Sequence, residues 1–198
     1  MVNNELQKII QQQISSRFGA RDERIHIATP DARHVLMRGL VHFCGEHTQW
    51  LPEYEAVSSW LECNGGRGIL CYGNCGRGKS LITQRIMPVI FQRWHGLIVN
   101  NVVASELASR FQEVSQYKLL SIDDVGTEDI ANRYGEKHDY FREIVDLAER
   151  KQKLLLISTN FGLKEIAERY GERTIDRLRA ITTTVQFNGR SLRGIRNG

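Results

Sequence analysis

The residues with the clearest chemistry lie between Gly73 and Ser80, where the chain reads Gly-Asn-Cys-Gly-Arg-Gly-Lys-Ser. This is the spacing of a phosphate loop. Gly73, Gly76 and Gly78 permit backbone conformations that a Cβ would forbid, so that successive N–H groups can turn toward a polyphosphate. Lys79 supplies a charge for the β- and γ-phosphates, and the Ser80 hydroxyl is a ligand for Mg²⁺. The spacing therefore predicts a site for ATP and Mg²⁺.

The predicted nucleotide contacts run without a gap from the end of one strand into the following helix. They are Gly73, Asn74, Cys75, Gly76, Arg77, Gly78, Lys79, Ser80 and Leu81.

Polar side chains also follow two later apolar runs. Asp123 and Asp124 come directly after residues 119–122, and Asn160 comes after residues 153–158. In open α/β sheets, ligands bind at this carboxyl edge of the strands. We expect Asp123 to hold Mg²⁺ directly or through water, and Asp124 to orient the attacking water. Asn160 would position that water or sense the phosphate. The predicted metal ligands are thus Ser80 and Asp123. The predicted catalytic residues are Lys79, Asp123, Asp124 and Asn160.

These groups require a scaffold that alternates strands and helices. From Gly68 onward, short apolar strands and helical segments follow one another, which is typical of a parallel sheet covered on both faces. Pro88 is expected to kink or shorten the first of these helices. The expected strands are residues 69–72, 97–100, 118–122, 153–158 and 182–187, and the expected helices are residues 79–93, 104–114, 137–150, 163–169 and 173–179.

The N-terminal region differs from this pattern. Residues 31–45 and 52–63 are expected to be helical, and residues 4–17 carry an apolar stripe on an otherwise polar helix. That amphipathic helix would either pack on the core or dock into a groove of a partner. We expect a short helical region over residues 1–52 and an ATPase core over residues 53–198.

Composition excludes several classes of protein. With 198 residues, 41% hydrophobic and 25% charged, the chain fits one domain and is neither disordered nor a solenoid. No run is long and apolar enough for a membrane span, and the polar N-terminus is unlike a signal peptide, so a cytoplasmic location is expected.

The four cysteines form no C-x-x-C pair, which favours reduced thiols over zinc. A net charge of +4 suits nucleic acid or a solvated basic face.

Taken together, the motifs resemble those of the DnaC-like helicase loaders, which belong to the AAA+ ATPases. The IstB-type transposition helpers look very similar. The resemblance rests on residues 73–80, the Asp-Asp-Val-Gly after residue 122, the Ser-Thr-Asn at residues 158–160, and residues 170–178. It implies a five-stranded AAA+ core without a C-terminal helical lid, and a homo-oligomer that assembles on ATP. It also implies a replicative helicase and single-stranded DNA as partners.

The same resemblance assigns roles to three arginines. Arg177 would be an arginine finger that neutralises charge on the γ-phosphate of a neighbouring subunit, and Arg173 would be its companion. Arg193 would act in cis as the second sensor. Asp124 stands where most AAA+ proteins carry Glu, which implies slow hydrolysis and a timed switch.

The resemblance therefore implies an ATP-dependent helicase loader in DNA replication. Three alternatives stay open: a transposition helper, a small P-loop kinase, and a nucleotide-gated interaction module with negligible turnover. The sequence leaves open whether the DNA is single- or double-stranded.

Overall fold

The computed structural model describes residues 23–128, 131–133 and 136–192. The amphipathic segment 4–17 and Arg193 lie outside these residues, so their predicted roles stay predictions.

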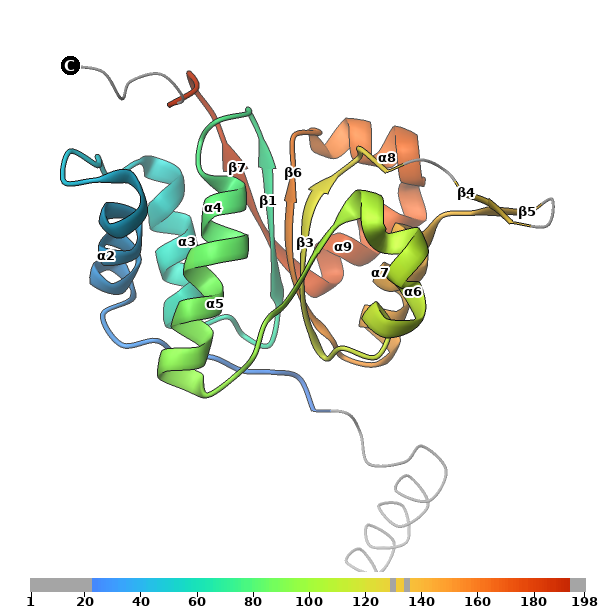
Figure 1. The fold of residues 1–198 in the computed structure, drawn as a ribbon, viewed down its shortest axis with the longest axis horizontal. Helices are drawn as coiled ribbons and strands as arrows, with labels where there is room; N and C mark the ends of the chain where they lie inside the picture. The colour runs from blue at the N-terminus through green and yellow to red at the C-terminus, as the bar shows by residue number, and fades with distance from the viewer. Residues whose placement is uncertain (1–22, 129–130, 134–135, 193–198) are drawn as a thin grey trace, which may run out of the picture.

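A five-stranded parallel sheet forms the centre of the described chain (Figure 1). In the order β2-β3-β6-β1-β7, β6 separates the strand before the phosphate loop from the strand that carries the aspartates. The predicted fold class, an α/β P-loop domain with five parallel strands, is confirmed. The strands are β1 (Gly68–Gly73), β2 (Asn100–Val103), β3 (Leu119–Val125), β6 (Leu154–Thr159) and β7 (Thr182–Phe187).

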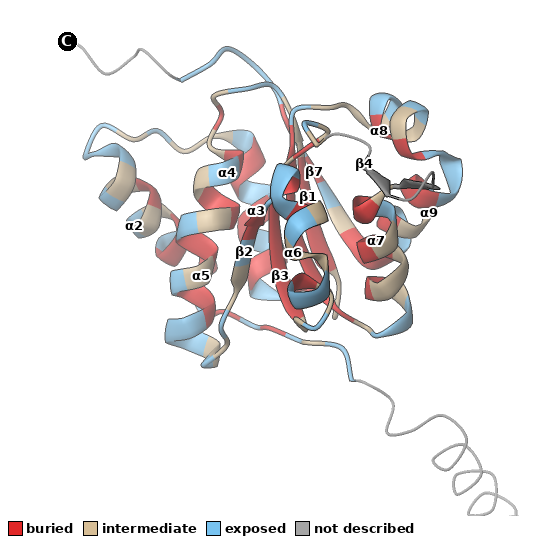
Figure 2. Cartoon of the chain, turned by 45° about the vertical axis from the view of Figure 1, so that its right-hand side comes forward, coloured by how far each residue is buried: buried red, intermediate tan, exposed pale blue. Residues whose placement is uncertain are grey.

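Helices cover both faces of the sheet, and the central strands consist largely of buried residues (Figure 2). Successive residues of a strand point to opposite faces. Ile69 therefore packs with one helical layer and Leu70 with the other. One layer contains α2 (Ala32–Cys44), α3 (Pro52–Glu62) and the helical stretch 79–95; the other contains α6 (Leu107–Val114), α7 (Tyr140–Arg150), α8 (Leu163–Tyr170) and α9 (Glu172–Ile181).

Three predicted boundaries are wrong, the first being the end of β3, which continues to Val125 and not only to residue 122. The apolar run expected as strand 97–100 only partly enters the core, because Ile98 is 72% exposed, and pairing with β3 begins at Asn100 opposite Leu120. The helix expected from residue 137 begins at Tyr140, because the preceding residues form a hairpin that the sequence did not indicate. That hairpin consists of β4 (Ala131–Arg133) and β5 (Glu136–His138).

The helix after the phosphate loop continues through Pro88, so of the two predicted effects the shortening is wrong, whereas the turn before Pro88 does depart from regular α-helix and is π-helical. Proline donates no amide hydrogen, and carbonyls in the preceding turn need other donors. Ser121 Oγ donates to Thr83 O at 3.1 Å, and Asn101 Nδ2 donates to Gln84 O at 2.9 Å. Side chains of β2 and β3 thus satisfy this turn and fasten the helix to the sheet. The stretch comprises α4 (Lys79–Leu81), the π-helical turn η1 (Ile82–Ile86), α5 (Met87–Ile90) and the π-helical turn η2 (Phe91–His95).

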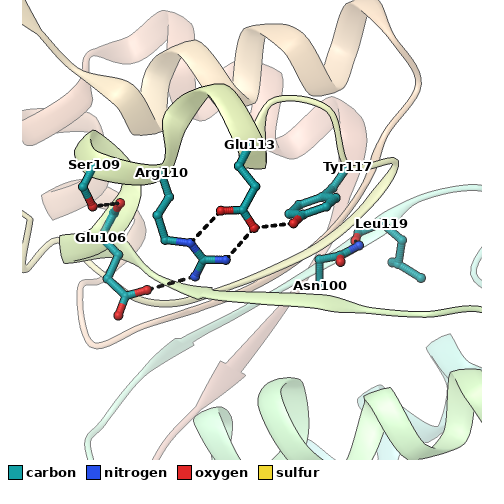
Figure 3. Close-up of polar contacts among 7 residues, drawn as sticks. All are labelled: Asn100, Glu106, Ser109, Arg110, Glu113, Tyr117 and Leu119. Atoms are coloured by element: carbon teal, nitrogen blue, oxygen red, sulfur yellow. Dashed lines mark hydrogen bonds and ion pairs between the residues drawn. The ribbon is translucent and has the colours of Figure 1, made fainter.

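A charged network stabilises the exposed side of α6 (Figure 3). The Arg110 guanidinium donates to both carboxylate oxygens of Glu113, at 3.1 and 2.9 Å, and to Glu106 at 3.1 Å. The Tyr117 hydroxyl also donates to Glu113. The hydrogen bonds from Arg110 are the main reason that the pKa of Glu113 falls to about 2, well below its ordinary value. This carboxylate therefore favours the folded state while it is ionised.

We expect this network to make stability depend on pH under acidic conditions. Because the folded pKa is depressed, the contribution is complete above the ordinary carboxyl pKa, roughly 4.3, and is lost as pH falls toward about 2. Glu113→Gln should reduce the loss of thermal stability across this window, measured by circular dichroism melting. Glu168→Gln, which removes only an exposed pair with Lys164 at 3.8 Å, is the control. Identical pH profiles for wild type and Glu113→Gln would contradict this expectation.

Candidate nucleotide site

The phosphate loop connects β1 to the helical stretch 79–95 in the predicted manner. Gly73 has φ +110°, and a Cβ there would come within 2.7 Å of Phe187 O. Gly78 has φ +95° and directly precedes the helix. These are conformations that side chains rarely adopt, so the glycines give the loop its shape.

Lys79 is buried at the centre of this loop, with 5% of its surface exposed. Its Nζ donates to Gly73 O at 2.8 Å, to Asn74 O at 2.7 Å and to Asn160 Oδ1 at 3.0 Å. A buried ammonium requires such oxygens around it. The contacts hold the charge between the phosphate loop and the end of β6.

The two aspartates lie at an irregularity of β3. The strand pairs with β6 in regular register up to Ile122, and the register then shifts before Val125. Asp124 has φ +55°, an uncommon conformation for a residue with a Cβ. Such a bulge redirects side chains at a strand end. Both Asp123 and Asp124 line the cavity described below.

Ser158 connects the aspartates to the neighbouring strand. This residue is only 1% exposed, and its hydroxyl donates to Asp123 Oδ1 while accepting the Asp124 N–H at 3.3 Å. Asn160 Nδ2 donates to Asp124 Oδ1 at 3.1 Å. Since Asn160 also accepts from Lys79, a continuous polar chain joins the phosphate-loop lysine to Asp124.

These groups surround a cavity of about 760 Å³. The sequence predicted that the strand ends would meet here, and the phosphate loop, both aspartates and Asn160 all contribute to the lining. The volume lies in the range of small-molecule and cofactor sites. The lining residues are Phe43, Cys44, Tyr54, Cys75, Gly76, Gly78, Lys79, Ser80, Leu81, Val103, Asp123, Asp124, Asn160 and Leu192.

The side chains of two predicted nucleotide contacts face elsewhere, and a third predicted contact, Gly73, does not line the cavity. The Asn74 side chain donates to Gly189 O at 3.0 Å, and Arg77 forms an ion pair with Glu53 at 2.5 Å. Neither Asn74 nor Arg77 is part of the cavity lining. Their side chains hold the loop from outside.

The arginines of α9 also lie away from the cavity lining. Arg177 is ion-paired with Asp146 and, at 2.9 Å, with Glu149, both on α7. Arg173 is exposed, and its side chain makes no hydrogen bond or ion pair within the described residues. Within one subunit, therefore, the Arg177 side chain is already ion-paired with α7, whereas the Arg173 side chain is exposed to solvent.

The donor set fits Mg²⁺ bound together with a polyphosphate. In the part of the chain that the structure describes, no group of three or more His, Cys, Asp or Glu could hold a metal ion alone. Mg²⁺ prefers oxygen ligands and commonly takes only one or two from protein, with the rest from water and phosphate. The Ser80 hydroxyl and the Asp123 carboxylate, both facing the cavity, are suited to that arrangement.

Sequence reasoning missed several residues of the site. Ser158 appeared only as part of a strand end, and Glu53 resembles any acidic residue in the first turn of a helix. Phe43 and Tyr54 come from the N-terminal helices, which no motif linked to the phosphate loop. Tyr54 donates from its hydroxyl to Arg77 O at 3.2 Å, and burial is the main reason that its pKa rises to about 12.

Solved structures with a similar fold include DnaI, at 17% identity and a TM-score of 0.53, covering 82% of this chain and 85% of that one. The DnaC helicase loader matches at 18% identity and a TM-score of 0.51, covering 81% and 93%. Domain III of the replication initiation protein DnaA from Thermotoga maritima matches at 18% identity and a TM-score of 0.53, covering 72% and 65%. No protein-family model matches the chain, and no curated protein does.

These likenesses show the fold. The chain shares the fold of DnaI, of the DnaC helicase loader and of domain III of DnaA, and the predicted resemblance to the DnaC-like helicase loaders is confirmed at the level of fold. Among the residues that the structure describes, no helix is long and apolar enough to cross a membrane.

Ser158 gives the site its first test. Ser158→Ala removes the hydroxyl that orients Asp123, and loss of such an outer partner typically weakens metal binding by roughly 10-fold or more. We expect the Mg²⁺ concentration that half-maximally supports ATP binding to rise accordingly, measured by titration with a fluorescent ATP analogue. Ser115→Ala, on the exposed end of α6, is the control. An unchanged Mg²⁺ requirement would mean that Ser158 only fills space in β6.

Proposed function

We propose that this protein is an ATP-dependent AAA+ ATPase that acts in DNA replication in the manner of a helicase loader. The observation that carries the proposal is the meeting of Lys79, Ser80, Asp123, Asp124 and Asn160 around one cavity. These are the residue types that phosphoryl transfer to water requires. The fold likeness to DnaI and to the DnaC helicase loader supports the replication role.

ATP binding would use groups that already face one another. The phosphate-loop N–H groups would donate to the phosphates, and Lys79 would exchange its loop carbonyls for β- and γ-phosphate oxygens. Ser80 and Asp123 would hold Mg²⁺, which neutralises charge on the phosphates when bound. Ser158 would keep the Asp123 carboxylate oriented.

Asp124 and Asn160 would then act on the attacking water. Asn160 donates to Asp124, so the carboxylate is oriented before any nucleotide arrives. Once Lys79 turns to the phosphates, Asn160 Oδ1 loses that partner and becomes free to accept a hydrogen bond from water. Asp124 is one methylene shorter than Glu, which favours slow hydrolysis and a switch that ATP holds in one state.

Completion of the site would require a second subunit. Arg173 is exposed on α9 and could reach a neighbour, whereas Arg177 would first have to leave Asp146 and Glu149. An arginine acting in trans neutralises transition-state charge and raises the rate by orders of magnitude. We therefore propose that ATP favours a homo-oligomer, with single-stranded DNA and a replicative helicase as its partners.

Hydrolysis by mixed mutants tests the shared site. The rate of ATP hydrolysis should rise more steeply than linearly with protein concentration and should increase with single-stranded DNA. Lys79→Ala and Arg177→Ala should each be inactive alone and partly active when mixed, because one supplies the finger and the other the intact site. Arg173→Ala, tested in the same way, distinguishes the two arginines. Arg179→Ala, exposed on the same helix, is the control.

Other outcomes identify the alternatives. A rate that is linear in protein and indifferent to DNA and to Arg177→Ala would contradict the shared site and favour a kinase. Tight ATP binding without turnover under any condition would favour the interaction module. Stimulation by duplex DNA rather than single strands would favour a transposition helper.

A further inference from the structure

Arg77 occupies a position in the phosphate loop from which its side chain turns away from the nucleotide cavity. Its Nε donates to Glu53 Oε1 at 2.7 Å, and the two side chains form an ion pair at 2.5 Å. Both residues are buried, with 8% and 6% exposure. They line a separate hollow of about 360 Å³ between the start of α3 and β7. The pair therefore lies behind the loop and does not line the nucleotide cavity.

The same guanidinium reaches the segment that follows β7. Arg77 Nη1 donates to Arg190 O at 3.3 Å. Three further hydrogen bonds join the loop to this segment: Asn74 N to Phe187 O at 2.8 Å, Asn74 Nδ2 to Gly189 O at 3.0 Å, and Leu192 N to Gly76 O at 2.9 Å. Residues 187–192 thus lie along the outside of the phosphate loop.

The backbone of Arg77 is fixed as well. The hydroxyl of Tyr54, the residue after Glu53, donates to Arg77 O at 3.2 Å. Hence α3 holds Arg77 by its side chain through Glu53 and by its carbonyl through Tyr54. The Tyr54 ring also lies against the Phe187 ring, with 6.4 Å between their centroids, so α3 contacts both the loop and the start of residues 187–192.

We propose that Arg77 is a positioning residue that, held by Glu53, ties the phosphate loop to residues 187–192 and keeps the loop in its phosphate-binding shape. This inference rests on the proposed ATP-binding function. Without the tie the loop would populate other conformations, and the apparent affinity for ATP would fall in proportion to the fraction that stays competent. Residues 187–192 would lose one of their four hydrogen bonds to the loop in the same event, so both segments should respond together.

The energetics of buried ion pairs determine the choice of variants. Removing one partner leaves an uncompensated buried charge and can unfold a protein, whereas replacing both by apolar residues of similar size is often neutral. Glu53→Met with Arg77→Met should therefore fold with a melting temperature near that of wild type, yet lack the bond to Arg190 O. Arg77→Lys keeps a positive charge beside Glu53, but an ammonium lacks the planar guanidinium that donates to Glu53 and to Arg190 O at the same time.

The test combines ATP affinity with backbone exchange. We expect the double variant to bind ATP about 10-fold more weakly, consistent with a competent fraction of about one tenth, and Arg77→Lys to fall between it and wild type. Without nucleotide, amide hydrogen exchange should accelerate both in residues 74–78 and in residues 187–192. Arg33→Met, which breaks an exposed ion pair between α2 and Glu55 of α3, should change neither readout.

The possible outcomes distinguish the role of Arg77 from the proposed ATP-binding function. Wild-type affinity and wild-type exchange in the double variant would overturn the role of Arg77 and leave the ATPase proposal standing. Faster exchange confined to one of the two segments would also overturn the tie. Failure of the wild-type protein itself to bind ATP would overturn the proposed function and this inference with it.

Discussion

The parallel alignment of β1, β3 and β6 is the constraint on which the site depends. Parallel neighbours end at one edge of the sheet, and hydrogen-bonded register brings the phosphate loop, the two aspartates and Asn160 to that edge. Because β6 lies between β1 and β3, Asn160 can accept from Lys79 on one side and donate to Asp124 on the other. The polar chain across the site follows from strand order.

The buried interior of the sheet fixes the position of this edge, while the loops and helix ends carry the polar side chains of the site. All six residues of β6 are buried, and the strand is paired on both sides. Asn160 follows directly after Thr159, the last buried residue of this strand. The loop itself is held from behind by α3 and by residues 187–192, so its backbone is ordered before a ligand supplies any contact. Such preorganisation lowers the cost of binding.

The sequence predicted what depends on local pattern and on strand topology. The phosphate loop has a fixed spacing, and β7 was predicted at its observed bounds because its short apolar and β-branched run precedes a turn. The sequence did not predict features that depend on distant partners. Arg77 turns outward because of Glu53, 24 residues earlier, and Arg190, 113 residues later. Arg177 is occupied by α7, and Ser158 acquires its role only through the bulge in β3.

The central claim is that this edge of the sheet binds ATP with Mg²⁺ through the phosphate loop. Equilibrium titration of the wild-type protein and of Lys79→Ala with ATP, each with Mg²⁺ and with a chelator, tests it most directly. We predict saturable binding to wild type that weakens when Mg²⁺ is removed, and a loss of affinity of about 10-fold or more in Lys79→Ala, as expected for a charge-assisted contact of roughly 1.5–3 kcal/mol. Equal affinities for the two proteins, or no binding to either, would contradict the claim.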